Sequence, residues 1–287
     1  MTKTIKRKLI LSGITLAIAG FAATASTFAW FTSNSTVSTS SVTGTVASDA
    51  SIYIKNSTDA NWGNTATLNI GDTVFAPVQT SDGASFKTVD NKDADAKSYF
   101  QFTLEFTGTV GTGISMTKAS FAKATSDVFT LKADAGDSED VKKGKTLELD
   151  VVDAIQMVVT TPTQANTETS TNTTTTTSNT TKTYKYSPDE TVNYNALTYY
   201  NNMLGTTLTG QNTNSTLSSD VYLKNVNASK AGDIFLGYIP KDNENVLSVT
   251  FTIFLDGWDQ ECFDAICAQT FKASLSFAAT DSLPETV

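Results

Sequence analysis

LSVTFTIFLDGWDQECFDAICAQTFKASLSF, residues 247–277, is the stretch that decides the fold class of this chain. Apolar residues alternate with Ser and Thr in Leu247–Leu255, and a similar alternation returns in Phe271–Phe277. A period of two is typical of a strand that buries one face. Asp256-Gly257 follows the first run and is a turn dipeptide, because Gly adopts positive φ at little cost. The stretch therefore predicts two strands joined by a turn and a loop.

The rest of the chain repeats this strand pattern. In Ser98–Thr107, Phe and Leu fall on one face and polar side chains on the other. Helix is scarce, and Asn195–Leu204, ahead of Gly205, is the one short helix that we expect. We therefore predict an all-β chain, an antiparallel β-sandwich with at most one short helix besides an N-terminal signal helix. Shorter candidate strands, separated by Gly, Asn and Asp clusters, are Ser51–Lys55, Ala66–Ile70, Thr73–Gln79, Val128–Lys132, Leu147–Val159, Val221–Lys224 and Asp233–Ile239.

Residues 160–183 break the pattern. They read TTPTQANTETSTNTTTTTSNTTKT, in which 14 of the 24 residues are Thr. Such a segment has no apolar periodicity, so it cannot bury enough surface to offset its ordering entropy. We expect a disordered insertion within a single β-sandwich domain of residues 49–287. The functional alternative is a glycosylated or adhesive tract, since Ser/Thr-rich runs can carry O-linked glycans.

The absence of histidine and one pair of cysteines limit the chemistry that the chain can carry out. The chain has no histidine, which excludes Ser-His-Asp and Cys-His nucleophilic machinery and the HExxH zinc site. Cys262 and Cys267 are its only cysteines and lie in one loop. Outside the cell two such cysteines favour a disulfide, with free thiols or another role as the alternatives. Carboxylate-only chemistry, as in glycosidases, stays open as an alternative because the chain has many acids, although their spacing singles out no pair. We expect no catalytic residue, no metal site and no cofactor, and not an enzyme.

The charge balance points away from polyanionic partners. The chain carries 20 basic and 29 acidic residues, a net charge of −9. This excess of acid excludes nucleic acid as a partner and favours solubility. Acidic residues cluster in 90–95 and 134–140, where a calcium loop is the alternative to a solvated turn. Neither cluster has the EF-hand spacing.

Residues 1–29 have the layout of a secretory signal peptide. A basic head, Lys3 to Lys8, precedes an apolar run from Leu9 to Ala25 and then small residues. A retained membrane anchor is the alternative, although the run is short for a span. Contact with a membrane is therefore expected only through this segment.

The junction Thr27-Phe28-Ala29-Trp30-Phe31 resembles the SipW-type signal peptides of Gram-positive secreted proteins, among them the TasA/camelysin family of biofilm matrix proteins. The resemblance implies cleavage by signal peptidase between Ala29 and Trp30, whereas Ala25 is the plainer site. It also implies a jelly-roll-like sandwich, secreted to the exterior or surface of a Gram-positive-type bacterium. The 247–277 hairpin looks like the C-terminal hairpin of the same family.

The family resemblance implies a secreted, non-enzymatic structural protein of the cell surface or extracellular matrix. Its subunits assemble by donating the mature N-terminal segment to the sheet of the next subunit, so the expected partner is a second copy or another matrix subunit. Here the donor lies within residues 30–48, from Trp30 to about Val46. The expected assembly residues are Trp30, Phe31, Val37, Val42 and Val46.

Two alternatives remain open at this point. The N-terminal segment can instead fold back as the first strand of its own domain. The protein can instead be a monomeric adhesin or carbohydrate-binding module, in which exposed aromatic residues stack on sugars. The aromatic candidates are Trp62, Trp258, Tyr199 and Tyr200.

Overall fold

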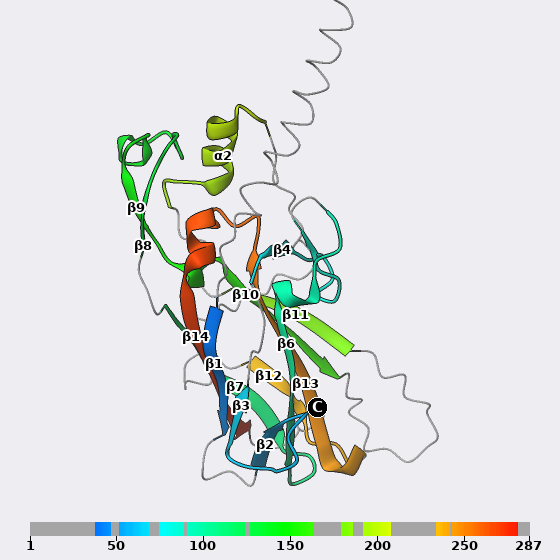
Figure 1. Ribbon diagram of the computed structural model, residues 1–287. Coiled ribbons are helices and arrows are strands. Elements are labelled where there is room, and N and C mark those ends of the chain that lie inside the picture. Colours follow the sequence, from blue (N-terminus) through cyan, green and yellow to red (C-terminus); the bar gives the residue numbers. More distant parts are fainter. Residues whose placement is uncertain are drawn as a thin grey trace, which may run out of the picture.

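Two β-sheets packed face to face form the body of the protein, seen in a computed structural model (Figure 1). The structure describes residues 38–46, 52–68, 75–88, 91–123, 127–162, 179–185, 192–207, 234–241 and 243–280. The predicted strand Val221–Lys224 lies outside these ranges. Within them the all-β sandwich is confirmed.

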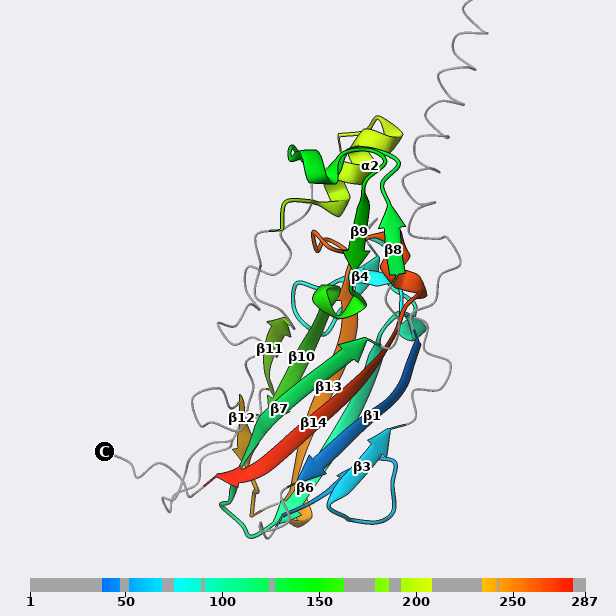
Figure 2. The same ribbon diagram turned by 90° about the vertical axis from the view of Figure 1, so that its left-hand side faces the viewer.

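The first sheet has five strands and faces the viewer in Figure 2. Its neighbours are antiparallel except for β1 and β14, which run parallel. In sheet order the strands are β12 (Ile234–Tyr238), β7 (Gly113–Lys123), β14 (Thr270–Thr280), β1 (Ser38–Val46) and β3 (Thr65–Leu68).

The second sheet lies behind the first and is built around β13 (Val246–Asp256). On one side β13 pairs with β10 (Ile155–Pro162), which pairs with β11 (Asn179–Lys185). On the other side it pairs with β6 (Phe100–Gly108), which pairs with β2 (Ile52–Asn56). The end of β13 also pairs in parallel with β4 (Pro77–Gln79), followed by β5 (Lys87–Thr88).

Two parallel pairs, β1 with β14 and β4 with β13, distinguish this fold from a purely antiparallel sandwich. A parallel neighbour cannot be joined by a tight hairpin, so its partner comes from a distant part of the chain. Successive strands often lie in opposite sheets, as do β1, β2 and β3, β6 and β7, and β13 and β14. These crossings wrap the chain around one core.

Aromatic rings from both sheets fill the space between the layers. Phe251 of β13 stacks on Phe102 of β6, with ring centroids 5.3 Å apart. Phe277 of β14 meets Phe106 edge to face at 4.9 Å. All four rings are buried. Side chains at alternate positions of β6 and β13 point into this core, as the period of two predicts.

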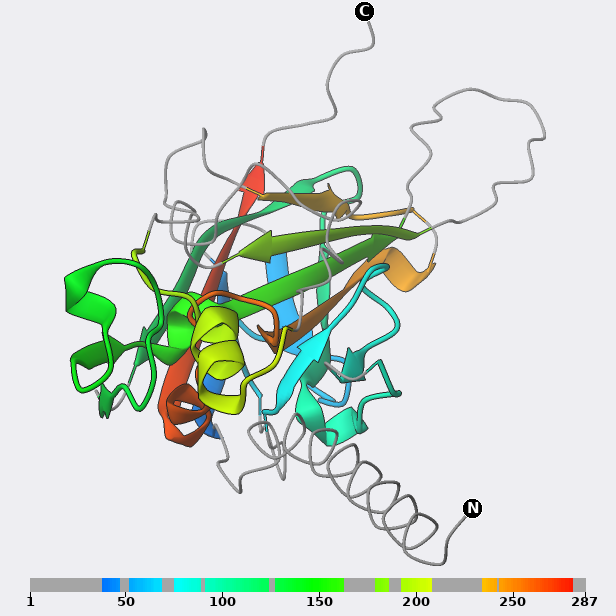
Figure 3. The same cartoon turned by 90° about the horizontal axis from the view of Figure 1, so that it is seen from above.

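A third, smaller unit forms the upper end of the molecule in Figure 1. It contains the two-stranded ribbon of β8 (Asp127–Thr130) and β9 (Thr146–Leu149) and the helix α2 (Ala196–Leu204), which lies beside the ribbon when seen from above (Figure 3). Asn195 caps α2 by accepting a hydrogen bond from the Thr198 N–H, and Gly205 ends it at φ 67°. The predicted short helix is confirmed. The described 3₁₀ helices are η1 (Ala96–Ser98), η2 (Glu139–Val141), η3 (Val151–Ala154), η5 (Asn243–Asn245) and η6 (Asp264–Ala268).

The Thr-rich stretch is more ordered at its ends than expected. Residues 160–162 belong to β10 and residues 179–183 to β11, with Thr160 opposite Thr181 and Pro162 opposite Asn179. The prediction that all of 160–183 is disordered is therefore wrong at both ends. Thr has a high strand propensity, and backbone pairing along an edge needs no apolar side chain. Residues 163–178 lie outside the described residues.

Candidate functional site

The expected donor segment provides the fourth strand of the first sheet, β1. Val42, Gly44 and Val46 are buried and alternate with the half-buried Thr43 and Thr45. Val42 and Val46 belong to the main apolar core. The strand thus presents one inward face with a period of two, although its sequence, STSSVTGTV, contains only two large apolar residues.

Backbone pairing on both sides holds β1 in its place. It runs parallel to β14, with Val42 opposite Ala273 and Val46 opposite Phe277. It runs antiparallel to β3, with Thr43 opposite Thr67. The Val46 N–H also donates to the Asn64 carbonyl oxygen at 2.9 Å. A strand with two paired edges satisfies its backbone groups without help from its side chains.

Gly44 packs closely against the core. A Cβ atom at this position would lie 3.2 Å from Ile54 Cδ1 and 3.4 Å from atoms of Leu104 and Phe277. These neighbours come from both sheets, so the strand fits closely only where the side chain is a hydrogen atom. Gly44 is therefore a packing glycine whose role the sequence alone did not indicate.

This arrangement corrects the expected boundary between the N-terminal segment and the domain. Residues 38–46 of the 30–48 segment are part of the sandwich, and Val42 and Val46 fill the core of their own chain. In this structure the segment folds back, because its inward Val and Gly residues complete a sheet that would otherwise end at β14. Trp30, Phe31 and Val37, and the cleavage site between Ala29 and Trp30, lie outside the described residues.

Two of the four aromatic candidates for sugar binding are buried. Tyr199 and Tyr200 of α2 pack around Phe263, with ring centroids 5.5 and 6.3 Å from it. Phe129 of β8 joins the same cluster. Sugar stacking and a place in the core were the two roles open to these tyrosines, and they belong to the core, because they occupy the face of α2 that covers the β13–β14 connection.

Trp258 is half-buried and serves the core rather than the surface. Its indole N–H donates to Gln79 Oε1 at 2.9 Å, and Gln79 Nε2 donates to the Thr88 carbonyl oxygen at 3.0 Å. Its backbone N–H donates to Asp256 Oδ1 at 3.0 Å, and Gln156 donates to the other oxygen of that carboxylate. This buried polar network fixes the turn after β13, because buried polar groups are costly unless they are hydrogen-bonded.

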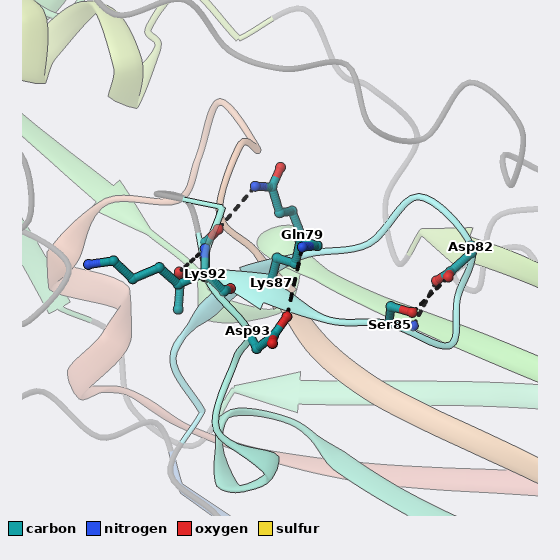
Figure 4. A network of polar contacts seen from close by, with 7 residues as sticks. Gln79, Asp82, Ser85, Lys87, Lys92 and Asp93 are labelled. Carbon is teal, nitrogen blue, oxygen red and sulfur yellow. Dashed lines mark hydrogen bonds and ion pairs between the residues drawn. The ribbon is translucent and has the colours of Figure 1, made fainter.

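The loop between β4 and β5 and the turn after β5 carry a second set of polar contacts (Figure 4). Asp82 accepts hydrogen bonds from the backbone of Ala84 and Ser85 and from the hydroxyls of Thr80 and Ser85. Partial burial alone would raise the pKa of Asp82, but these hydrogen bonds outweigh it and the pKa is lowered. Across the strand ends, Lys87 Nζ lies 3.8 Å from Asp93 Oδ1. These contacts order the loop.

The remaining aromatic candidate, Trp62, lies at the surface beside the edge strand β2. Its side chain is 37% exposed, and Lys55 Nζ lies over its ring, 4.8 Å from the centroid. Lys55 also pairs with Glu105 Oε2 of β6 at 3.1 Å. Tyr53, two residues before Lys55 and on the same outward face of β2, is 50% exposed. Sequence reasoning named Trp62 but missed Lys55 over its ring, Glu105 paired with Lys55, and Tyr53 on the same face of β2.

The two cysteines lie within the cluster beneath α2. Both are buried, on either side of Phe263 and Ile266. No disulfide bond joins Cys262 to Cys267 in the structure. The disulfide therefore stays a prediction for the exported protein. Nearby, the Tyr194 hydroxyl donates to Glu261 Oε1 at 2.9 Å, and burial together with this carboxylate raises the pKa of Tyr194.

Comparison with family models, with curated proteins and with solved structures found no match to this chain. In the described ranges, no cluster of three or more acidic or Cys side chains is arranged to hold a metal ion. Nor does the described part of the chain contain a helix with the length and apolar character needed to cross a membrane.

Proposed function

We propose that this protein is a secreted, non-enzymatic subunit of a cell-surface or extracellular-matrix assembly, and that copies join by exchanging β1. The observation that carries the proposal is the position of β1: a strand near the N-terminus, with few large side chains, occupies an interior slot between β14 and β3. A neighbouring copy that supplied its own β1 to this slot would remake every contact described above.

Exchange of this kind has a simple energetic basis. The closed monomer and the exchanged pair contain the same β1 contacts, so their balance depends on protein concentration and on the connection between β1 and β2. That connection spans residues 47–51. Each copy that donates β1 to one neighbour leaves its own slot for another, so exchange that does not close into a ring produces a chain of subunits.

Export accounts for the N-terminal end of the proposal. Residues 1–29 provide the signal peptide, and cleavage after Ala29 would leave Trp30 and Phe31 ahead of β1. N-terminal sequencing of secreted material tests this directly. A chain starting at Trp30 supports the proposal, a start at Ser26 corrects only the site, and an intact Met1 in the cytosol contradicts export.

A pair of engineered cysteines distinguishes exchange from self-closure. Thr43 of β1 faces Thr67 of β3 in the antiparallel register. In a background lacking Cys262 and Cys267, we expect Thr43→Cys with Thr67→Cys to form disulfides between chains once the protein has assembled. Electrophoresis without reductant would then show a ladder of covalent multimers.

The control pair is Thr103→Cys with Thr250→Cys. These hydroxyls lie 3.0 Å apart on β6 and β13, which do not take part in the exchange. This variant should give monomers only, at every concentration. Electron microscopy shows whether the concentrated protein has assembled. The proposal fails if assembled protein of the Thr43–Thr67 pair gives only monomers on electrophoresis without reductant.

A further inference from the structure

We infer that the outward face of β2 is a binding site for a neutral polysaccharide, centred on Trp62 and Tyr53. This site is independent of the proposed exchange of β1. Tyr53 and Lys55 project from the same face of β2, about 7 Å apart along the strand. Trp62 reaches the same place from the β2–β3 connection, because Gly63 forms a bridge with Ile54.

The ring of Trp62 is held in position before any ligand arrives. Lys55 Nζ lies over one face of the ring, and Glu105 fixes Lys55 through the 3.1 Å ion pair. The side chains of this pair are only 18% and 22% exposed, so the ammonium has little freedom to move away. An aromatic ring fixed in this way loses little conformational entropy on binding.

The surroundings of Trp62 are polar but carry few charges. The connecting loop, residues 56–64, contains several Asn side chains together with Ser57, Thr58 and Asp59, and its residues are half-buried or exposed. Asn56 Nδ2 donates to Thr58 Oγ1 at 2.8 Å, and the Asp59 N–H donates to the Asn56 carbonyl oxygen, which orders the turn. Amide and hydroxyl groups beside exposed rings match a ligand that has both hydroxyls and C–H faces.

The charges of the site select among ligand classes. An anionic ligand gains little from Lys55, because Glu105 already neutralises it. A cationic ligand would meet the ammonium that covers the ring of Trp62. Nucleic acid is disfavoured by the net charge of −9. A neutral glycan needs no free cation and is not repelled by Lys55 or by the net negative charge, so it is the ligand class that fits the site best.

Affinity electrophoresis in native gels tests the site, with laminarin and dextran as neutral probes and alginate as the anionic one. We expect a neutral glucan to retard the full chain, and alginate to have a smaller effect. Trp62→Ala should raise the apparent dissociation constant for the neutral glucan at least tenfold, and Tyr53→Ala should raise it less. Trp62→Phe should bind more tightly than Trp62→Ala but less tightly than the unaltered chain. Circular dichroism melting verifies that each variant is folded.

Phe235→Ala is the matched control. Phe235 is a 49% exposed aromatic residue on β12, in the other sheet, and its removal should leave glucan binding unchanged. The inference is overturned if neither neutral glucan retards the unaltered chain, if Trp62→Ala binds as well as it does, or if alginate is the stronger ligand. None of these outcomes bears on the exchange of β1, which the cysteine pairs measure separately.

Discussion

β1 and β13 occupy similar places and are held there by different means. Each lies in the interior of a sheet with a paired neighbour on both sides. The inward face of β13 carries five large apolar residues, all buried, whereas β1 carries two Val residues and a Gly. Burial of an aliphatic or aromatic side chain contributes about 1.5–3 kcal/mol. By that measure side chains stabilise β13 by on the order of 10 kcal/mol and β1 by well under half as much.

The difference indicates what each strand is suited for. β13 also forms aromatic contacts with both layers and ends in the buried Gln156–Asp256–Trp258 network. Moving it would dismantle the core. β1 depends mainly on backbone hydrogen bonds, which any strand of similar shape can supply. The same fold therefore contains one strand that defines it and one that can be replaced by an equivalent strand.

The largest expected effect on stability comes from truncating Phe251, a buried aromatic side chain of β13. Phe251 is fully buried and contacts Phe102 at 5.3 Å and Phe277 at 6.0 Å. Phe251→Ala should lower the free energy of unfolding by about 3–5 kcal/mol, because it leaves a cavity between the layers. Urea denaturation measures the loss. Ser248→Ala, on the exposed face of the same strand, is the control and should change stability by less than about 0.5 kcal/mol.

A smaller loss is expected on β1. Val42 is fully buried, and Val42→Ala should cost about 2 kcal/mol. The same substitution should reduce the multimer ladder of the Thr43–Thr67 cysteine pair. In an exchanged copy β1 would bury Val42 in the core of the neighbouring subunit, so the loss of this side chain weakens the exchanged state as well. Thr45→Ala, on the outward face of β1, should leave both readings nearly unchanged, because it removes only a 3.4 Å hydrogen bond to Ser276. If Val42→Ala costs as much as Phe251→Ala, the contrast between the two strands is wrong.

Overpacking the slot should sharpen the contrast further. A side chain at Gly44 meets Ile54 at 3.2 Å, so Gly44→Val should destabilise the fold by about 1–3 kcal/mol. We expect Ile54→Val in the same chain to recover part of this loss, since it removes the atom in closest contact. Thermal melts of the single and double variants give the coupling, and strict additivity would mean that the two side chains do not meet.

The smallest effect concerns the loop that follows β4, the short partner of the end of β13. The pKa of Asp82 is lowered in the folded protein, so its carboxylate stabilises the fold above the unfolded pKa of about 3.8. That contribution is lost as the pH falls through the lower folded value. Asp82→Asn should cost well under 1 kcal/mol at pH 7, because solvent screens this exposed group, and the cost should shrink as the pH falls below 3.8. Urea melts of Asp82→Asn and the unaltered chain across this pH range measure the difference.

The strands that the sequence predicts well are those whose alternation is complete. β6, β13 and β14 contain the predicted alternating stretches, since their inward positions are nearly all large and apolar. β7 was missed. Its inward residues are Ile114 and Met116 and then Ala119 and Phe121, so the alternation changes phase at the irregularity opposite Ser276. A β-bulge of this kind breaks the period of two on which the prediction depends.

Long-range features were beyond the reach of the sequence for physical reasons. The stretch Leu147–Val159 reads as one strand, but the Asp150 side chain accepts the Val152 N–H and starts η3, which splits it into β9 and β10. β1 itself has a strand sequence, but its parallel partner lies more than 200 residues away. The site around Trp62 likewise depends on Glu105, which strand pairing rather than sequence proximity brings to Lys55.

The parallel pairing of β1 with β14 also determines when β1 can join its sheet during synthesis of the chain. A chain that is made from its N-terminus produces β1 early and β14 more than 200 residues later. At typical rates of synthesis of about 5–20 residues per second, β1 waits for at least ten seconds without its principal neighbour. Contacts this distant in sequence are among the slowest to form. During that interval β1 can pair with the empty slot of another copy that has already donated its own β1.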